Sequence, residues 1–407
     1  MTTTLLPAPP AETRTASRVP GRPVVLLLSL LTIFGPISMD LYLPALPALT
    51  TDLGAATSTA QLTVSACLFG LAVGQVIAGP LSDRVGRRLP LLLGVVAYLL
   101  TSLACAASPT VGVLIASRLV QGMAGGVGIV VAQAAGRDLY SGARLLRYYG
   151  QLTVLAGLAA MIGPVVGGQL ARATDWRGLF LFLAAVGAVV LVASLGMFRE
   201  TLPAERRTSG GMAETRRHMR ALLRDRTFVG AVLVTGFLNA ALFAYLAGAT
   251  FLLQDVYGLS PQGYSYAFAL NSFGFMVFGF AAARWCVSRS VPGTLLVGLA
   301  MCGLGAVGLL AAATLHLPLV AVVVSLVALV SGVAVTTPPT TSLALADYPH
   351  MAGTAASFLG VARFAFGGLS APLVGLGGSS ALPLGIVTVT CTALAALGYA
   401  LTRDLSN

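Results

Sequence analysis

The chain has 407 residues, of which 57% are hydrophobic and 9% are charged, and its mean hydropathy is +0.90. Because soluble domains carry about 25% charged residues, this composition excludes an ordinary soluble protein and indicates many membrane spans. The net charge is +11, and all 24 basic residues are arginines. A P-loop requires a lysine that contacts the nucleotide phosphates, so ATP hydrolysis at such a motif is excluded.

Apolar stretches of membrane-spanning length recur along the whole chain. A helix of about 20 apolar residues crosses about 30 Å of hydrocarbon, and twelve stretches of this kind are predicted. They begin near Val24, Ala60, Leu89, Thr110, Leu145, Trp176, Phe228, Pro261, Pro292, Leu317, Gly353 and Ala381. The sequence therefore predicts an all-α integral membrane protein with twelve transmembrane helices.

The hydrophilic segment 199–226 separates the predicted spans into two groups of six. GPVVGG at 163–168 in the fifth span is echoed by APLVGLGG at 371–378 in the eleventh, as expected for two parallel halves. We therefore predict a tail at 1–22, a six-helix bundle at 23–198, a linker at 199–226, a second six-helix bundle at 227–402 and a C-terminal segment at 403–407. The two bundles are expected to be pseudo-symmetric.

Arginines are concentrated in the predicted loops of one side. When the N-terminus is placed in the cytoplasm, the arginines of the tail, of 79–88 and of 199–226 fall on the cytoplasmic side, as the positive-inside rule requires. The positive charge therefore reports orientation and gives no support for a nucleic-acid partner. We expect a multi-pass protein of the bacterial cytoplasmic membrane, a monomer in the lipid bilayer with both termini in the cytoplasm.

The reactive side chains do not form the pattern of a metal or catalytic site. The five cysteines lie inside or at the ends of predicted spans without a CxxC pair, and the three histidines are dispersed. We interpret the cysteines as packing residues and expect neither a metal nor a cofactor. A membrane enzyme or receptor is the rival class, and it would need a catalytic cluster that the sequence does not group within a span.

The turn GPLSDRVGRR at 79–88 concentrates charge between the second and third predicted spans. Hydrocarbon cannot solvate four ionised groups at acceptable cost, so the turn must lie at a water interface. Asp138 ends the fourth span on the same side and is the expected partner of the arginines. The residues that carry the pattern are Gly79, Asp83, Arg84, Gly86, Arg87 and Arg88. The alternative is a basic turn that only fixes orientation.

Three charged residues are predicted inside the spans. Arg118 in the fourth span and Asp40 in the first are each displaced outward by about 6 Å from the helix midpoint, at 1.5 Å per residue. We expect them to share one level of a central cavity; a purely structural ion pair, or an arginine that reaches the outer interface, is the alternative. Arg363 lies near the middle of the eleventh span. Because this cavity is net positive, neutral or weakly anionic polar substrates are expected rather than dications.

Four motifs together resemble the major facilitator superfamily, and in particular its drug:proton antiporters of the Bcr/CflA type, associated with bicyclomycin and chloramphenicol resistance. They are the 79–88 turn, RLVQG at 118–122, MDLYLPALP at 39–47, and the fifth-span residues Gly157, Gly163, Pro164, Gly167 and Gly168. The resemblance is close over the N-terminal half and mainly architectural over the C-terminal half.

The resemblance implies roles for several of these residues. The turn and Asp138 would form a conformational latch on the cytoplasmic side, with the start of the eleventh helix near Gly353 offering its dipole to Asp83. Arg118 would take part in proton coupling. The fifth-span glycines and proline would accompany exchange rather than symport, and plain small-residue packing is the alternative for them.

The sequence thus predicts a proton-coupled secondary transporter that exports small drug-like compounds, amphenicol-like or bicyclomycin-like, by alternating access. Asp40 would carry the proton, and Arg118 would keep that carboxylate ionised until a proton or substrate competes for it. The candidate substrate contacts are Tyr42, Gln121, Asn239, Tyr245, Gln254, Asn271 and Arg363. The alternative is an uptake symporter or facilitator for a small polar nutrient, which shares the fold and reverses the direction.

Overall fold

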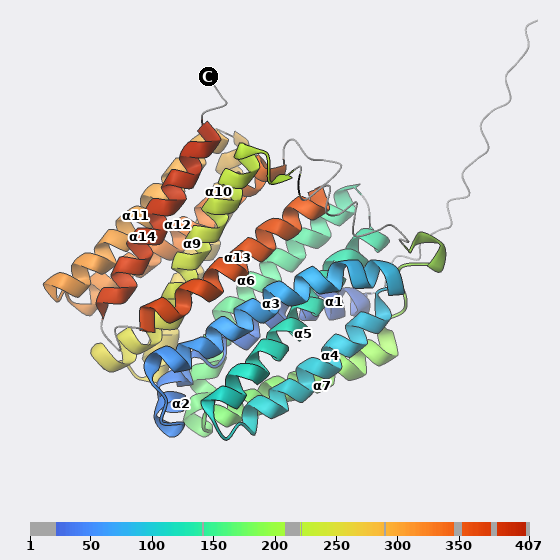
Figure 1. Cartoon of the computed structure of the whole chain (residues 1–407), viewed down its shortest axis with the longest axis horizontal. Coiled ribbons are helices and arrows are strands. Elements are labelled where there is room, and N and C mark those ends of the chain that lie inside the picture. The colour runs from blue at the N-terminus through green and yellow to red at the C-terminus, as the bar shows by residue number, and fades with distance from the viewer. Residues whose placement is uncertain are drawn as a thin grey trace, which may run out of the picture.

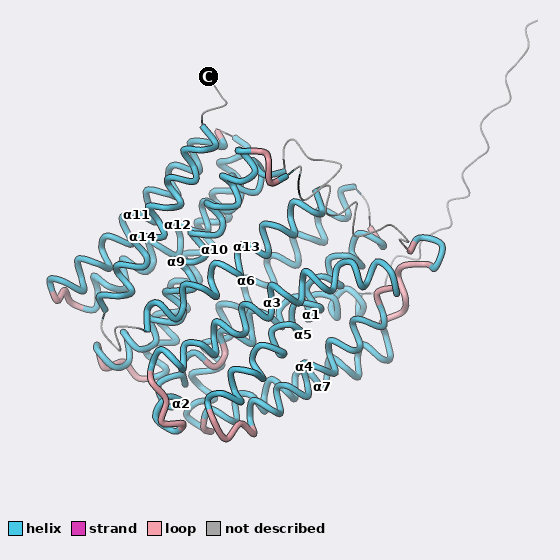
Figure 2. Tube along the Cα trace, in the orientation of Figure 1, coloured by secondary structure: helices cyan, strands magenta, loops and turns pink. Residues whose placement is uncertain are grey.

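The computed structural model describes residues 22–140, 142–207, 220, 222–288, 290–345, 352–375 and 381–403. These residues form long helices and contain no strand (Figures 1 and 2). The N-terminal half holds α1 (Arg22–Asp40), α3 (Thr57–Val85), α4 (Arg88–Ala106), α5 (Val111–Leu139), α6 (Gly142–Ala173) and α7 (Trp176–Met197). The C-terminal half holds α9 (Arg226–Phe251), α10 (Pro261–Ser288), α11 (Val291–Leu315), α12 (Leu319–Leu345), α13 (Ala352–Gly375) and α14 (Ala381–Arg403).

Each of these helices begins within a few residues of the predicted start of a span. Eleven are long and apolar enough to cross a membrane over their described residues. The other is α6, which is 32 residues long and includes side chains outside the described set. The prediction of a helical membrane protein with twelve long helices is therefore confirmed.

Prolines divide the first predicted span. After α1 the chain forms the short 3₁₀ helix η1 (Leu43–Ala45) and then α2 (Leu46–Asp52). Pro44 and Pro47 lie in the first turns of these two elements, where a missing N–H costs least. This break places Asp40 at the point where the straight part of the first span ends.

The helices of the N-terminal half pack closely because several crossings use glycine. A Cβ on Gly70 of α3 or on Gly122 of α5 would overlap the backbone of the other helix. Such close approach is the usual way in which transmembrane helices gain packing contacts in lipid. It fixes the position of the α5 segment that contains Arg118 and Gln121.

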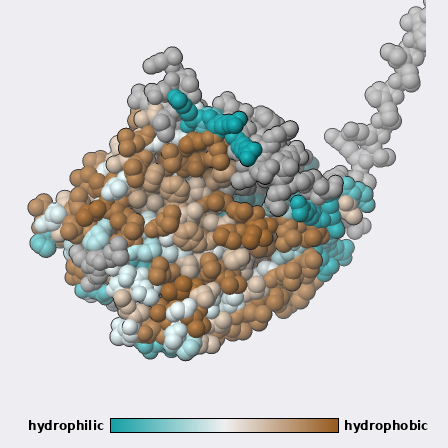
Figure 3. Space-filling view, in the orientation of Figure 1, coloured by the Kyte–Doolittle hydropathy of each residue, from teal (hydrophilic) through white to brown (hydrophobic). Residues whose placement is uncertain are grey.

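The outer surface is apolar over the sides of the bundle. Large hydrophobic side chains such as Val192, Leu304 and Val320 are 71%, 73% and 71% exposed. In Figure 3 hydrophobic residues cover much of the visible face, and a group of hydrophilic residues gathers near one edge. An exposed apolar belt of this kind belongs against lipid tails.

Successive helices run in alternating directions, so their ends form two opposite ends of the bundle. We call the end that carries the 79–88 turn, the end of α5 and residues 199–207 the arginine-rich end, and the end that carries η1 and α2 the opposite end. The two halves meet where α3 lies beside α13 and α6 beside α10 (Figure 1).

Hydrogen bonds between side chains of one half and the backbone of the other lie toward the opposite end. Gln254 Nε2 donates to the Pro44 carbonyl at 3.0 Å, and Gln262 Nε2 donates to the Gly168 carbonyl at 2.9 Å. Gln61 Nε2 also donates to a carbonyl of α9, at 3.3 Å. Among the described residues no such bond joins the halves at the arginine-rich end.

Candidate functional site

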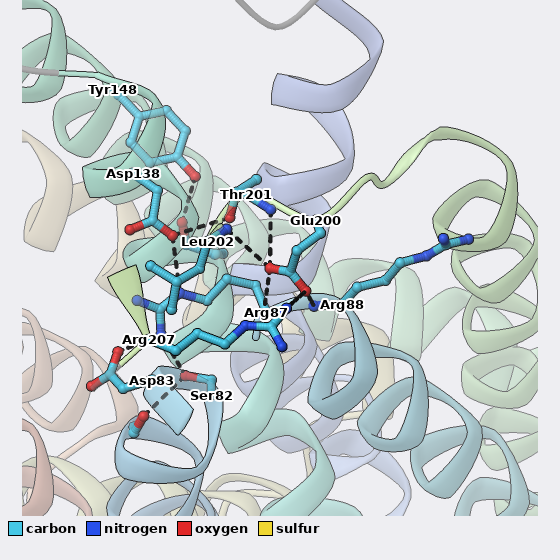
Figure 4. A network of polar contacts seen from close by, with 12 residues as sticks. Ser82, Asp83, Arg87, Arg88, Asp138, Tyr148, Glu200, Thr201, Leu202 and Arg207 are labelled. Carbon is cyan, nitrogen blue, oxygen red and sulfur yellow. Dashed lines mark hydrogen bonds and ion pairs between the residues drawn. The ribbon is translucent and has the colours of Figure 1, made fainter. Parts of the chain in front are cut away.

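Arg87 is the centre of a polar network at the arginine-rich end (Figure 4). Its Nε donates to Asp138 Oδ2 at 3.0 Å, and its Nη1 donates to Asp83 Oδ1 at 2.5 Å and to Ser82 Oγ at 2.8 Å. Burial acts to lower the pKa of Arg87, but its hydrogen bonds to Asp138 and Asp83 outweigh that effect, so the pKa is raised. The guanidinium therefore ties the ends of α3 and α5 to the start of α4.

Glu200, which follows α7, joins the same network. Its carboxylate accepts the backbone N–H groups of Arg87 at 2.8 Å and Arg88 at 3.2 Å, and those of Thr201 and Leu202 at 3.0 Å each. Burial acts to raise the pKa of Glu200, but these backbone donors and the nearby Arg207 outweigh it and lower the pKa. An acid near the first N–H groups of α4 also complements the positive end of the helix dipole.

Gly86 makes this contact possible. Its φ is +98°, a region that residues with a side chain rarely adopt. A Cβ at this position would also overlap Glu200 Oε2 and lie 2.8 Å from Arg207 Nη2. The backbone conformation therefore favours glycine at this position, and a larger residue would also displace the Glu200 carboxylate from the turn.

The other predicted latch residues take different positions. Arg84 and Arg88 are exposed, and Gly79 lies inside α3. The described partners of Asp83 and Asp138 are Arg87 and, for Asp138, also Thr201 after α7; none of them belongs to the C-terminal half. The side chains at 352–354, where α13 begins, lie outside the described residues, so the predicted approach of this helix to Asp83 stays a prediction.

Arg118 is wholly buried and does not pair with Asp40. Its Nη1 donates to Gln121 Oε1 at 2.6 Å, and its guanidinium carbon lies 4.4 Å from the centre of the Tyr42 ring. Gln121 Nε2 in turn donates to Ser102 Oγ at 2.7 Å. No ion pair between Asp40 and Arg118 exists among the described residues, so the alternative of a purely structural ion pair is not observed in this conformation. The physical reason is that neutral and aromatic groups already surround the guanidinium.

The ring of Tyr42 is closed off as well. Its side chain is 0% exposed, and its hydroxyl group is 3.0 Å from Thr63 Oγ1. Tyr42 and Gln121, both predicted as substrate contacts, therefore hold Arg118 in this conformation. Their predicted role in substrate binding stays a prediction.

Asp40 lies at the end of α1, beside α6. It is 5% exposed, and its carboxylate makes no hydrogen bond or ion pair with a described residue. A Cβ on Gly163 would lie 3.2 Å from the Asp40 Cβ, and a Cβ on Gly167 would overlap the Leu41 carbonyl. The fold thus places the buried acid directly against the predicted antiporter motif.

The α6 motif faces two neighbours. Gly163 and Gly167 face the chain at Asp40 and Leu41, whereas a Cβ on Gly168 would overlap Ser265 Oγ of α10. The Pro164 carbonyl accepts a hydrogen bond from the same Ser265 hydroxyl at 2.7 Å. Gly168 therefore faces α10 rather than α1, because α6 lies between α1 and the other half. Gly157 lies in α6, but its surroundings are outside the described residues.

Arg363 and Asn239 lie together in the C-terminal half. Arg363 Nε donates to Asn239 Oδ1 at 2.9 Å, and both residues line a cavity of about 210 Å³. Four threonines of α12 share the lining: Thr336, Thr337, Thr340 and Thr341. The structure brings these two predicted substrate contacts together.

The remaining predicted substrate contacts lie elsewhere. Asn271 Nδ2 donates to the Tyr245 hydroxyl at 2.8 Å, and both side chains are nearly fully buried. Gln254 lines a second cavity of about 320 Å³ at the opposite end, together with Asp52 and Arg177. In this conformation these residues do not share the cavity of Arg363.

Sequence reasoning missed two groups of residues. Glu200 could have been found as an acid placed directly after a span on the side of the basic turn. The cavity threonines flank two prolines in the sequence TTPPTT at 336–341. Polar residues on both sides of a proline pair inside a span indicate a segment that lines a cavity.

Comparison with known proteins decides what kind of protein carries these features. The profile of the Major Facilitator Superfamily matches residues 28–372. The chain belongs to the Major Facilitator Superfamily. The superfamily consists of membrane transporters rather than enzymes, so this member is a multi-pass membrane transporter.

Relatives of this superfamily member align over most of its length. It is 33% identical to an uncharacterized MFS-type transporter, YdgK, of Bacillus subtilis, over 92% of this chain and 93% of the relative. It is 27% identical to the bicyclomycin resistance protein homolog of Haemophilus influenzae, over 92% of this chain and 94% of the relative. The resemblance predicted from the motifs is thereby confirmed.

A solved structure shows the same fold at low identity. The xylose transporter XylE of Escherichia coli, in a partially occluded inward open conformation, superposes with a TM-score of 0.72 at 14% identity, over 91% of this chain and 96% of XylE. At this sequence identity the similarity shows only that the two proteins share a fold.

Proposed function

We propose that this transporter exports small drug-like compounds from the bacterial cytoplasm in exchange for protons, by alternating access. Relatives named for resistance to bicyclomycin and to multiple drugs support the direction and the substrate type. Amphenicol-like and bicyclomycin-like compounds, neutral or weakly anionic, suit an interior that holds Arg118, Arg363 and Asp40.

The observation that carries the proposal is the state of Asp40. It is a buried acid inside the first span (Pro23–Asp52), without a described hydrogen-bond or ion-pair partner. A charged side chain at such a place is expensive and marks a functional site. An acid that is not committed to a structural ion pair is free to take up and release a proton during the cycle.

The position of Asp40 supports coupling to movement of the halves. It packs against Gly163, and α6 contacts α10 of the other half through the next residue, Pro164, and through Gly168. Protonation of Asp40 removes a charge from this junction. The loss of this charge favours a different packing of α1 against α6. Such a change can shift the equilibrium between two arrangements of the halves.

Arg118 acts in the proposed cycle as a fixed positive charge. Its contacts with Gln121 and Tyr42 keep it buried, and an approach to Asp40 in another conformation would stabilise the ionised carboxylate. The cross-half bonds at the opposite end support an inward-facing state for this conformation, with the cytoplasm on the side of the arginine-rich end.

The test measures export and coupling separately. The chain is expressed in an efflux-deficient bacterial host, susceptibility to chloramphenicol, florfenicol and bicyclomycin is scored, and substrate-dependent proton movement is followed in everted vesicles. We expect Asp40→Asn to lose gradient-driven transport and to keep substrate exchange without a gradient. Asp40→Glu, which restores a titratable group, should recover part of the driven transport.

The matched control is Asp255→Asn, which changes an exposed acid at the opposite end. It should behave as the unmodified protein does. The proposal fails if Asp40→Asn supports gradient-dependent export between about pH 6 and pH 8 at an unchanged protein level. Accumulation of labelled substrate in energised cells would instead indicate uptake.

A further inference from the structure

The cavity beside Arg363 has a composition that sets it apart from the rest of the interior. It is lined by residues of α9, α12 and α13, and its volume is about 210 Å³. Arg363 is its charged residue, and no acid is among the described residues that line it. Asn239 and Arg363 lie at the midpoints of α9 and α13, whereas Thr235, Gly360 and the α12 threonines that also line the cavity lie in the halves of their helices nearer the arginine-rich end. The cavity therefore extends from the membrane centre toward that end.

Asn239 holds the guanidinium in a fixed orientation. Its Oδ1 accepts from Arg363 Nε at 2.9 Å, and its Nδ2 donates to the Thr235 carbonyl at 2.8 Å. Since both ends of the amide are engaged, Asn239 cannot rotate without losing a bond. Arg363 Nη1 and Nη2, the fork of the guanidinium, make no hydrogen bond or ion pair with any described residue.

The contrast with Arg118 shows that this open fork is specific to Arg363. Arg118 is 0% exposed, and its Nη1 and Nη2 contact Gln121 and Met39 while the Tyr42 ring covers it. Arg363 is only half-buried and borders free volume. A charged side chain inside a membrane helix is expensive unless its donors are engaged, and the bond to Asn239 engages only Nε, which leaves Nη1 and Nη2 open to a ligand.

The threonines on the opposite wall present oxygen atoms as acceptors. The Thr336 and Thr337 hydroxyl groups both donate to the Val333 carbonyl, at 2.8 and 2.9 Å, and Thr340 donates to the Thr336 carbonyl at 2.7 Å. With their protons directed into α12, these hydroxyl oxygens can accept bonds from N–H or O–H groups of a ligand.

We propose that this cavity binds the carboxylate of a small organic acid that enters from the cytoplasm. Nη1 and Nη2 of Arg363 form a bidentate pair with the carboxylate, Asn239 acts as the positioning residue, and the threonines accept from a hydroxyl or amide group of the same compound. The proposal deepens the proposed function, on which it rests, by making monoanionic compounds the preferred class of exported substrate.

The size of the cavity defines how much of the substrate it holds. Pockets that enclose a drug-sized ligand have volumes of about 300–1,000 Å³, so a cavity of about 210 Å³ takes the acidic head group. The remainder of the compound extends toward the space between the two halves. Dications are rejected here because they would face the uncompensated charge of Arg363.

The experiment compares an acid with its neutral isostere. Binding of salicylate and of salicylamide to the purified full-length protein in maltoside micelles is measured by calorimetry or ligand-induced thermal stabilisation. We expect Arg363→Gln to weaken salicylate roughly 10- to 100-fold, the usual range for loss of a charge-assisted pair, and to leave salicylamide unchanged. Arg363→Lys should retain intermediate salicylate affinity, because the charge remains and the fork is lost.

Two controls separate this site from general charge and from lipid. Arg284→Gln removes an exposed arginine that covers Phe280, outside the cavity, and should not alter salicylate binding. Phosphatidylglycerol added to the micelles should not compete with salicylate. Competition that depends on Arg363 would assign the site to a lipid phosphate and overturn the proposal.

The outcomes also distinguish this proposal from the proposed function. No binding of salicylate up to about 10 mM, equal binding of both probes, or an unchanged affinity in Arg363→Gln overturns the carboxylate site. The binding assay needs neither a proton gradient nor a variant of Asp40, so its outcome does not depend on the proposed coupling. If export fails in cells but salicylate binding still depends on Arg363, the carboxylate site is supported, and the proposed direction of transport or its coupling to protons is wrong.

Discussion

Arg87 and Asp138 form the ion pair that joins the start of α4 to the end of α5, with Nε 3.0 Å from Oδ2 and both side chains largely buried at 6% and 14% exposure. The neighbouring Arg84 belongs to the same basic turn and is exposed. Two arginines three residues apart thus differ in environment, which makes the turn testable by matched substitutions.

We expect Arg87→Gln to lower transport roughly tenfold or more, because it leaves the Asp138 carboxylate buried without its cation. Arg84→Gln should change transport little, since exposed charges contribute little. Both variants carry the same chemical change and the same change in net charge. The rate of export per amount of protein in vesicles measures the difference, and an equal loss in both would contradict a specific role for the buried network.

The stabilising effect of Glu200 should depend on pH. Its pKa is lowered in the folded protein, because the backbone donors of Arg87, Leu202 and Arg88 outweigh the opposite effect of burial. A lowered pKa means that the ionised form stabilises the fold above the unfolded value of about 4.3. That contribution is lost as the pH falls through the lower folded-state value.

Thermal unfolding of the unmodified protein and of Glu200→Gln measures this effect. The difference in melting temperature should be constant from about pH 8 to about pH 5 and should shrink below about pH 4.3. Glu205→Gln changes an exposed acid in the short helix η2 (Ala204–Arg206) and should stay close to the unmodified protein. A difference for Glu200→Gln that grows as the pH falls would have the wrong sign.

Gly167→Ala should damage both stability and transport. Its new Cβ would overlap the Leu41 carbonyl, next to Asp40, and overpacking of this kind costs about 1–3 kcal/mol. Gly196→Ala places the same methyl group where no atom lies within 4 Å, so it should be neutral or slightly stabilising. Melting temperature and export rate measure both variants; a Gly167→Ala protein with unchanged values would show that α1 and α6 do not need this close approach.

The twelve helix starts could be predicted because hydropathy and helix breakers act locally. Each predicted start lies within a few residues of the observed one, as at Trp176 and Ala381. The position of the 79–88 turn at an aqueous end follows equally from the cost of charge in hydrocarbon. The contact of Glu200 with this turn was not predicted, because it depends on where the chain leaves α7 relative to α4.

For the buried charges, too, the sequence predicted the residues but not their contacts. The sequence was sufficient to select Asp40, Arg118 and Arg363, because an ionisable residue within an apolar span is unusual wherever it points. Their partners depend on the rotation of each helix about its axis, which hydropathy does not specify. Only the packing shows Arg118 against Gln121 and Tyr42, Asp40 beside Gly163, and Gly168 turned toward α10.

By itself the sequence therefore determined the membrane fold, the superfamily, the charged end of the bundle and the three buried charges, since each rests on the solvation of local stretches of chain. The tertiary structure alone decided which of these charges have partners. It surrounds Arg118 with neutral groups, leaves Asp40 without a described partner, and fixes Arg363 with Asn239 so that its fork faces a cavity. These relations join residues distant in sequence, and they follow from side-chain packing between helices.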